Sequence, residues 1–177
     1  MSVVNGLPPG SVVGGFQILQ VLGQGGFGIV YVAFDPGLHR KVAIKEYFPQ
    51  QFARREGLAV SPSHPGATEM FESGLQRFVR EARLLSLINE RAGTRASLVI
   101  VHAVLPANGT AYMVMKLYEG VPLNQFLLQS PATVTEPWLV GTLLQLLDAL
   151  EALHSLPGEH LVHRDVAPDN IIIQPDG

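Results

Sequence analysis

Short runs of β-branched and aromatic residues alternate with polar positions through the first half of the chain. These runs predict strands at residues 16–22, 29–34 and 41–48, and again at 98–104 and 111–116. Turn signals separate consecutive runs at Asp35-Pro36-Gly37 and at Asn108-Gly109, which predicts antiparallel hairpins. Residues 49–70 contain several Pro, Gly and Ser residues, so we expect a loop there.

The apolar spacing becomes helical in two later places. From Leu75 to Glu90, the apolar residues fall on one arc of a helical wheel: Leu75, Phe78, Val79, Ala82, Leu85 and Ile88. A second helix is expected from Pro137 to His154, because proline suits the first helical turn. Gln145 interrupts its apolar run, which predicts an amphipathic helix rather than a membrane span. The pattern as a whole predicts an α+β fold.

Composition narrows the function classes only mildly. The 177 residues carry a net charge of −3, which gives no reason to expect nucleic acid or an acidic membrane surface as a partner. The absence of cysteine excludes disulfides and thiolate chemistry, and it fits a cytoplasmic location. The first residues lack the basic and apolar regions of a signal peptide. The histidines show no metal-ligand spacing, so no zinc site is expected.

A glycine-rich segment, Gly23-Gln24-Gly25-Gly26-Phe27-Gly28, separates the first two predicted strands. The spacing G-x-G-x-x-G also occurs in flexible turns, and 18 glycines make a chance match easy. Ile29-Val30-Tyr31-Val32 follows and disfavours a helix, so the segment does not fit a dinucleotide-binding fold. In a strand–loop–strand flap, glycines let the backbone approach phosphate oxygens and present its N–H groups.

Two charged residues, Lys45 and Glu81, also fit phosphate binding. Strand alternation places Ala43 and Lys45 on one face, which leaves room for a flat ring beside a cation for phosphate. The alternative is a solvent-facing lysine on an edge strand. Glu81 falls within the apolar arc of the first helix, where a buried carboxylate needs a partner, and Lys45 is the candidate. Alternatively, Glu81 lies at the margin of the arc and reaches water.

Residues 163–170 read His-Arg-Asp-Val-Ala-Pro-Asp-Asn and precede an apolar strand expected at 171–173. Asp165 is placed to accept a proton from an attacking hydroxyl, and Asn170 offers an amide oxygen to a metal ion. Asp and Asn are also common in turns, where their side chains bond to the backbone. The order of flap, lysine and loop along the chain favours the catalytic interpretation.

From about Phe16 to Gly177, the chain resembles the bacterial branch of the eukaryotic-type serine/threonine protein kinase family. The motif positions that carry the resemblance are Gly23, Gly25, Gly28, Val30, Ala43, Lys45, Glu81, His163, Arg164, Asp165 and Asn170. The resemblance implies a two-lobed α+β fold. Residues 1–119 would form an N-lobe with an antiparallel sheet and one main helix, and residues 120–177 the start of a helical C-lobe.

The resemblance also implies ATP and Mg²⁺ as cofactors, and phosphoryl transfer to Ser/Thr hydroxyls of proteins. Asp165, Lys45 and Glu81 would be catalytic, and Asn170 would hold magnesium. The implied ATP-binding residues are Leu22, Gly23, Gly25, Gly28, Val30, Ala43, Lys45, Met115, Lys116, Tyr118 and Ile172. Met115 would guard the back pocket, the Lys116 carbonyl and the Tyr118 N–H would bond adenine, and Ile172 would form the floor. Arg164 would hold the activation segment.

Departures from the family pattern leave alternatives open. Ala167 stands where serine/threonine kinases usually carry a lysine that touches the transferring phosphate, so a nucleotide-binding pseudokinase is the second interpretation. A small-molecule phosphotransferase is a third, although such enzymes tend to show His-Gly-Asp in place of His163-Arg164-Asp165. The chain contains no Asp-Phe-Gly, so we expect a kinase fragment that is inactive alone. The protein substrate is not specified.

Overall fold

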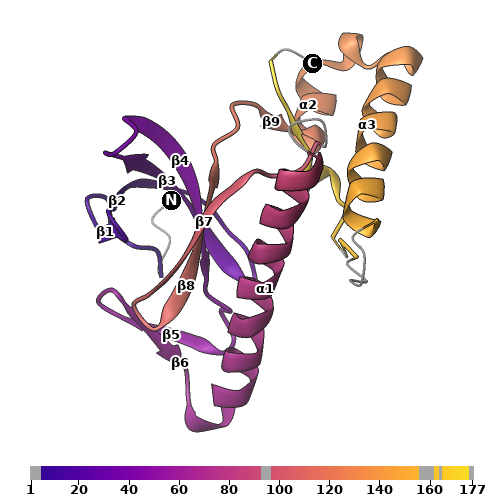
Figure 1. Cartoon of the computed structure of the whole chain (residues 1–177). Helices are drawn as coiled ribbons and strands as arrows, with labels where there is room; N and C mark the ends of the chain where they lie inside the picture. The colour runs from indigo at the N-terminus through magenta and orange to yellow at the C-terminus, as the bar shows by residue number, and fades with distance from the viewer. Residues whose placement is uncertain (1–4, 93–96, 156–161, 164, 176–177) are drawn as a thin grey trace. The chain divides into compact units, whose positions relative to one another are not determined.

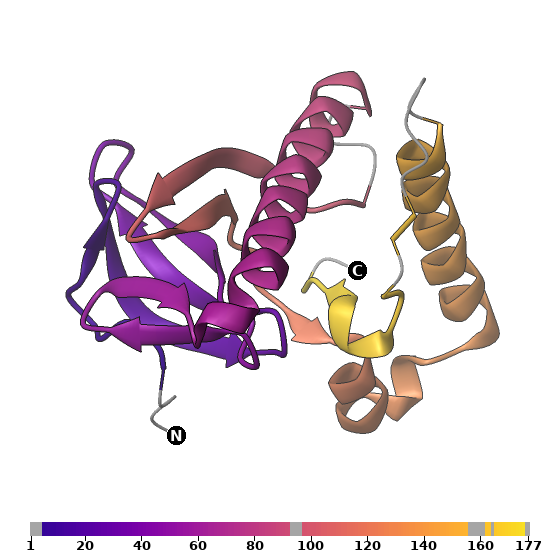
Figure 2. The same cartoon turned by 90° about the horizontal axis from the view of Figure 1, so that it is seen from below.

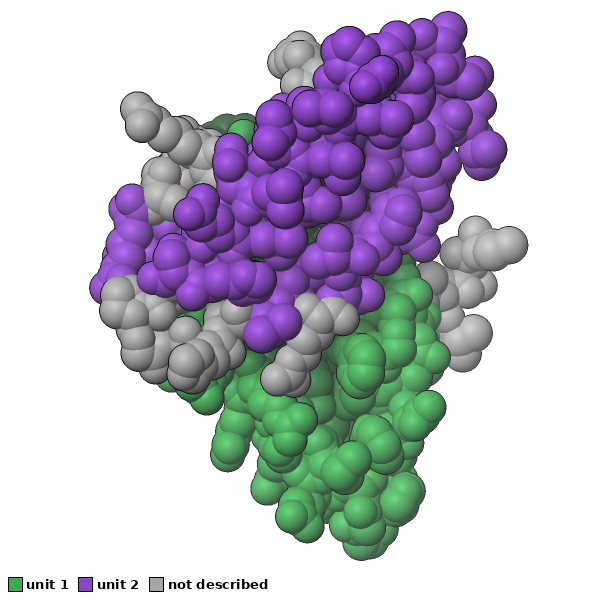
Figure 3. All heavy atoms as spheres, turned by 90° about the vertical axis from the view of Figure 1, so that its right-hand side faces the viewer, with its two compact units in different colours: residues 1–86, 99–117 green, residues 87–98, 118–177 purple. Residues whose placement is uncertain are grey.

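The computed structural model describes residues 5–92, 97–155, 162–163 and 165–175. The chain divides into two units, residues 1–86 with 99–117 and residues 87–98 with 118–177, which Figure 3 colours separately. The first unit holds the main sheet and most of the longest helix, and the second holds the end of that helix and the helices that follow it in the chain. The lobe boundary expected after residue 119 stays a prediction.

A six-stranded antiparallel sheet forms the body of the first unit (Figure 1). In spatial order its strands are β1 (Val12–Val13), β2 (Phe16–Gln24), β3 (Gly28–Asp35), β4 (Arg40–Tyr47), β8 (Thr110–Lys116) and β7 (Val101–Ala107). Asn108 and Gly109 connect β7 to β8 with φ angles of 54° and 74°, the left-handed pair that a tight hairpin turn requires. The antiparallel hairpins expected from the sequence are therefore confirmed.

The loop expected at residues 49–70 is wrong. This stretch contains the hairpin of β5 (Ala53–Glu56) and β6 (Ala59–Pro62), the 3₁₀-helix η1 (Pro65–Ala67) and the first residues of helix α1. Arg55 explains the error, because it pairs across the hairpin with the buried Val60. A charged residue on the buried side interrupts the apolar alternation by which a strand is recognised in a sequence.

The longest helix, α1 (Thr68–Ala92), begins earlier than the sequence predicts and lies alongside the sheet in Figure 2. Phe71 and Phe78 are buried on its sheet side. Tyr47, at the end of β4, packs between them with ring-centroid distances of 5.4 and 5.8 Å, and its hydroxyl donates to the Phe71 carbonyl at 3.0 Å. Gly74 is needed at this crossing, because a Cβ there would overlap the Tyr47 hydroxyl oxygen.

The two faces of β4 have different neighbours. The face of Tyr47 packs against α1, as just described, and Lys45 shares that face by alternation. The opposite face carries the buried side chains of Val42, Ile44 and Glu46. The β5–β6 hairpin reaches this face through Arg55, which donates to Glu46. Strand β4 is therefore held from both sides.

Besides the end of α1, the second unit contains further helices and a two-stranded ladder. They are α2 (Leu123–Gln129), η3 (Pro131–Thr133), α3 (Glu136–His154), η4 (Pro168–Asn170) and the antiparallel pair β9 (Val121–Pro122) and β10 (Ile172–Ile173). Thr135 caps α3 by accepting a hydrogen bond from the Trp138 N–H at 3.4 Å. Trp138 stacks on Phe126 of α2 at 5.1 Å. Within the described residues, every helix is too short or too polar to cross a membrane.

Candidate active site

The glycine segment forms the turn between β2 and β3, so the predicted strand–loop–strand flap is confirmed. The Gly25 N–H donates to the Gly28 carbonyl at 2.9 Å and closes the turn. Leu22 lies where the pairing of β2 with β3 shifts register, between Val21 and Gly23, and it is 51% exposed. Such a shift bends the strand and changes the direction of the chain just before the turn.

The motif glycines serve different purposes. A Cβ on Gly28 would lie 2.5 Å from the Glu46 carbonyl oxygen, so the close approach of β4 requires glycine there. A Cβ on Gly23 or Gly25 would meet nothing within 4 Å, and neither residue has a positive φ. No contact within the described part of the chain therefore demands glycine at these two positions. A ligand whose oxygens approach the backbone closely would demand it.

Four of the predicted ATP-binding residues share one face of the sheet. Val30 of β3 lies opposite Lys45 of β4, and Ala43 lies opposite Met115 of β8. Opposed residues of antiparallel strands point to the same face, and alternation puts Ala43 and Lys45 on that face together. Ala43 is buried, and the other three are half-buried. The fold thus places a cation beside a small residue, and the roles of these residues toward ATP stay predictions.

Glu81 is exposed, which corrects the expectation of a buried carboxylate on α1. The helical wheel allowed Glu81 to lie within the apolar arc or at its margin, and the structure places it at the margin. In this part of α1 the buried side is centred on Phe71, Phe78 and Ala82, and Glu81 falls beyond its edge. Among the residues that the structure describes, no ion pair joins Glu81 to Lys45. The pairing of Glu81 with Lys45 stays a prediction.

The buried carboxylate of the first unit is Glu46, which the sequence analysis missed. Glu46 is 0% exposed and accepts hydrogen bonds from the Tyr31 hydroxyl at 2.6 Å and the Tyr112 hydroxyl at 2.8 Å. The Arg55 guanidinium donates to it at 2.5 Å. Strand alternation could have found it, because Glu46 lies two positions beyond the buried Ile44. We call Tyr31, Glu46, Arg55 and Tyr112 the Glu46 cluster.

The charges within the Glu46 cluster compensate one another. Burial raises the pKa of Tyr31 and of Tyr112 well above the usual tyrosine value, and the negative charge of Glu46 raises both further. Burial lowers the pKa of Arg55, but the hydrogen bond to Glu46 and its charge outweigh this and raise the pKa overall. At neutral pH the tyrosines therefore stay protonated as donors and the arginine stays charged. The cluster fixes the strand of Lys45 from the opposite face.

Met115, Lys116 and Tyr118, which the resemblance places around adenine, are divided between the two units, with Tyr118 in the second. Lys116 ends β8, and its N–H donates to the Ile100 carbonyl at 2.9 Å. The Tyr118 hydroxyl donates to the Leu98 carbonyl at 3.4 Å. Gly120 has a φ of 156°, and a Cβ there would overlap the Ile173 carbonyl oxygen. This glycine therefore lets β9 pair closely with β10.

Asp165 and Asn170 lie together in the second unit. The Asn170 side-chain amide donates to the Asp165 carboxylate at 2.9 Å and to the Asp165 backbone carbonyl at 3.0 Å. Helix η4 sets their spacing, because the Asn170 N–H donates to the Ala167 carbonyl at 2.9 Å. Ile172 follows in β10 and is 43% exposed. Arg164 lies outside the described residues.

The sequence motifs and the fold point to one family. A model of the protein kinase domain matches residues 16–177. The chain belongs to the protein kinase family. Serine/threonine-protein kinase PknD of Mycobacterium tuberculosis (strain ATCC 25618 / H37Rv) is 30% identical over 164 residues, 93% of this chain and 21% of that protein. Serine/threonine-protein kinase pkn2 of Myxococcus xanthus is 32% identical over 169 residues, 94% of this chain and 17% of that protein.

Solved structures agree with this membership. The kinase chain matches the apo form of PpkA-294 with a TM-score of 0.84 and 37% identity, over 97% of this chain and 59% of that one. It matches the Mycobacterium tuberculosis PknI kinase domain with a TM-score of 0.68 and 22% identity, over 96% of this chain and 59% of that one. The expected kinase-like α+β fold is confirmed. The chain spans about a fifth of the length of the curated relatives named above.

The side-chain oxygens of Asp165 and Asn170 would suit the magnesium ion that the protein kinase family generally uses. Asn170 uses its amide nitrogen to bond Asp165, so its amide oxygen remains for a cation, and the adjacent carboxylate favours positive charge. Within the described residues, no group of three or more His, Cys, Asp or Glu side chains could hold a metal. Mg²⁺ needs no such cage, because it commonly keeps several waters and binds substrate phosphates.

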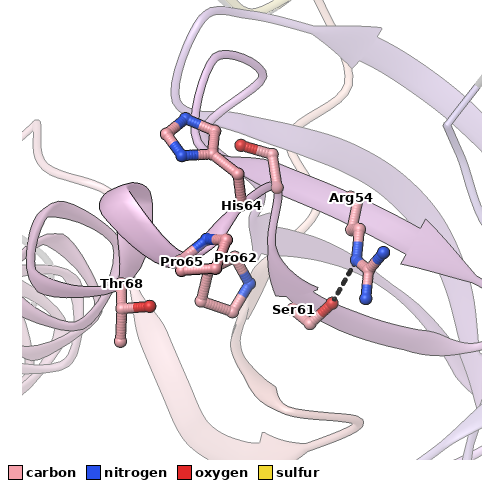
Figure 4. A pocket seen from close by; sticks show the side chains of 7 residues that line it. Arg54, Ser61, Pro62, His64, Pro65 and Thr68 are labelled. Carbon is pink, nitrogen blue, oxygen red and sulfur yellow. Dashed lines mark hydrogen bonds between the residues drawn. The ribbon is translucent and has the colours of Figure 1, made fainter.

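A cavity of about 390 Å³ lies at the β5–β6 hairpin and the start of α1 (Figure 4). Its lining residues are Arg54, Ser61, Pro62, Ser63, His64, Pro65 and Thr68. Arg54 donates from Nε to the Ser61 hydroxyl oxygen at 3.1 Å. None of the predicted ATP-binding residues lines this cavity. The nucleotide site predicted at the sheet face and the glycine turn therefore lies outside this cavity.

Proposed function

We propose that this domain binds ATP and transfers its terminal phosphoryl group to Ser/Thr hydroxyls of proteins. One observation carries the proposal. Gly23 and Gly25 have open space where a Cβ would stand, and the turn that holds them adjoins the strands whose shared face presents Lys45. Glycine without an internal reason, close to a half-buried cation, fits a polyanionic ligand that approaches the backbone.

The predicted roles follow from the chemistry of each side chain. Val30, Ala43 and Met115 offer an apolar surface to adenine, and Lys45 offers positive charge to phosphate. Asp165 accepts the proton of the attacking hydroxyl, and its hydrogen bond with Asn170 fixes its orientation. Bound Mg²⁺, held by the Asn170 amide oxygen, would neutralise charge on the phosphates. A cytoplasmic location and the lack of nucleic-acid partners stay predictions from composition.

A second function, a nucleotide-binding pseudokinase, is favoured by two observations. Ala167 offers no cation to a transferring phosphate. Glu81 is exposed and forms no ion pair with Lys45 within the described residues. A pseudokinase would bind ATP through the same sheet face and transfer no phosphate. The two functions therefore share the nucleotide site and differ only in turnover.

Calorimetric titration of Lys45→Ala with ATP and with adenosine tests the nucleotide site. We expect the variant to lose affinity for ATP and to keep its affinity for adenosine, because lysine meets phosphate and not the ring. Lys41→Ala is the matched control, since Lys41 is exposed on the same strand and lies opposite Phe34, away from the glycine turn. Equal losses of ATP and adenosine affinity in Lys45→Ala would contradict the proposal.

A further inference from the structure

The glycine turn is tied to the segment that follows β4. The Phe48 N–H donates to the Phe27 carbonyl at 3.2 Å, and the Gln50 N–H donates to the Gly26 carbonyl at 3.1 Å. The Gln50 side-chain amide adds a third bond, from Nε2 to the Gly25 carbonyl at 2.9 Å. Three consecutive carbonyls of the turn are thus turned toward residues 48–50.

The backbone N–H groups at the tip of the turn, in contrast to its carbonyls, are not engaged by any residue that the structure describes. Within the described residues, the N–H groups of Gly26 and Phe27 donate to no protein acceptor. An anion is bound by N–H groups and repelled by carbonyl oxygens. A turn whose carbonyls are engaged and whose N–H groups are open has the polarity that phosphate oxygens need.

Packing does little to hold the turn in this state. Phe27, at its tip, is 78% exposed, and a Cβ at Gly25 or Gly26 would touch nothing within 4 Å. Glycine-rich backbone also has many other conformations available. Besides the bond from the Gly25 N–H to the Gly28 carbonyl that closes the turn, the hydrogen bonds from Phe48 and Gln50 are therefore the main interactions that select this conformation. Of these, only the bond from the Gln50 amide comes from a side chain.

We propose that Gln50 is a positioning residue for nucleotide phosphate. Its side-chain amide holds the Gly25 carbonyl away from the phosphate side, and because the planar trans peptide fixes the next N–H in the opposite direction, this keeps the Gly26 N–H directed toward the ligand. The Gln50 backbone N–H acts in the same way on the Phe27 N–H, through the Gly26 carbonyl. Gln50 itself touches no nucleotide in this account. The inference rests on the proposed function, because it assigns the glycine turn to phosphate binding.

Substitution of Gln50 by methionine tests the hydrogen bond to the Gly25 carbonyl, because methionine has a similar length and no amide donor. One exposed neutral hydrogen bond corresponds to a loss of about two- to tenfold in the affinity for ATP. We expect adenosine affinity to change by less than about twofold, since adenosine carries no phosphate. Gln51→Met is the matched control. Gln51 is also exposed, and its side chain makes no hydrogen bond within the described residues.

Two readouts separate positioning from a general effect on the fold. Hydrogen exchange of the Gly25 and Phe48 N–H groups, which donate to the Gly28 and Phe27 carbonyls, should be faster without nucleotide in Gln50→Met than in wild type and unchanged in Gln51→Met. The thermal unfolding temperature should stay the same in both variants, because Gln50 is exposed. Gln50→Ala serves as a second variant and should reproduce both results.

The outcomes are distinct. A selective loss of ATP affinity together with faster exchange in the turn supports the inference. Equal losses of ATP and adenosine affinity, or no loss in either, would overturn the inference while leaving the proposed function intact, provided that Lys45→Ala still discriminates between the ligands. If Lys45→Ala fails to discriminate as well, the proposed function is wrong and the inference falls with it.

Discussion

The Glu46 carboxylate and the Arg55 guanidinium form an ion pair of 2.5 Å whose side chains are 0% and 8% exposed. The pair joins β4, the strand of Lys45, to the β5–β6 hairpin. Tyr31 and Tyr112 complete the hydrogen bonding of the carboxylate, and within the described residues no buried side-chain polar atom lacks a partner. This buried ion pair thus lies on the face of β4 opposite to that of Lys45, the predicted phosphate-binding lysine.

The first prediction concerns the loss of one partner of this pair. Arg55→Met should lower the free energy of unfolding by about 3–5 kcal/mol, because it leaves a buried carboxylate without its compensating charge. Arg54→Met is the matched control, since the interactions of Arg54 are exposed: an ion pair with Glu56, with side chains 58% and 72% exposed, and a hydrogen bond to Ser61. Its effect should stay within about 1 kcal/mol. Urea unfolding of both variants measures the difference, and similar values would contradict the assignment.

The second prediction concerns alkaline pH. The pKa values of Tyr31 and Tyr112 are raised by burial and by Glu46, so in the unfolded chain both tyrosines release their protons at lower pH than in the folded protein. Their contribution to stability is therefore complete below about pH 10 and is lost as the pH rises above it.

Urea unfolding between pH 9 and pH 11 measures this loss. Each tyrosine should contribute a slope of about 1.4 kcal/mol per pH unit once its unfolded form titrates. Tyr112→Phe should be less stable than wild type at pH 9, because Glu46 loses a donor. It should also show a shallower decline above pH 10. An unchanged slope in Tyr112→Phe would show that the hydroxyl is not responsible.

The third prediction separates the two kinds of motif glycine. Gly28→Ala should destabilise the fold by about 1–3 kcal/mol, because its Cβ would lie 2.5 Å from a backbone oxygen of β4. Gly25→Ala should leave stability unchanged or slightly raised, since its Cβ has open space. Gly25→Ala should instead weaken ATP binding while retaining adenosine binding. Thermal unfolding and titration of both variants provide the comparison, and reversed effects would refute this division.

Sequence patterns predicted the six-stranded sheet better than the β5–β6 hairpin. Strands β3 and β4 contain short apolar runs with β-branched residues, and the left-handed turn of Asn108 and Gly109 needs the residue types found there. The β5–β6 hairpin was missed because Arg55 occupies a buried position that an apolar residue usually fills. Its burial depends on Glu46, which is distant enough in sequence that local periodicity carries no sign of it.

The candidate site was predictable in its residue types and less so in its geometry. The placement of Val30, Ala43, Lys45 and Met115 on one face follows from alternation and register. The exposure of Glu81 does not, because the helical wheel gives an angular position, whereas the sheet contacts of α1 decide which side is buried. The hydrogen bond from Gln50 to the Gly25 carbonyl was equally unpredictable from the sequence, since hydrogen bonds to backbone carbonyls impose no periodic pattern.

The most direct test of the account is phosphoryl transfer by the full-length protein from ATP to protein Ser/Thr residues, with Mg²⁺ present. Asp165→Asn should lower turnover by about 10²–10⁴-fold and leave ATP affinity nearly unchanged, because Asp165 acts on the attacking hydroxyl. Asp169→Asn removes the same charge from an exposed neighbour in η4 and should retain activity. Full activity in Asp165→Asn, or equal losses in the two variants, would contradict the catalytic assignment, and wild-type protein that binds ATP without transferring phosphate would establish the pseudokinase instead.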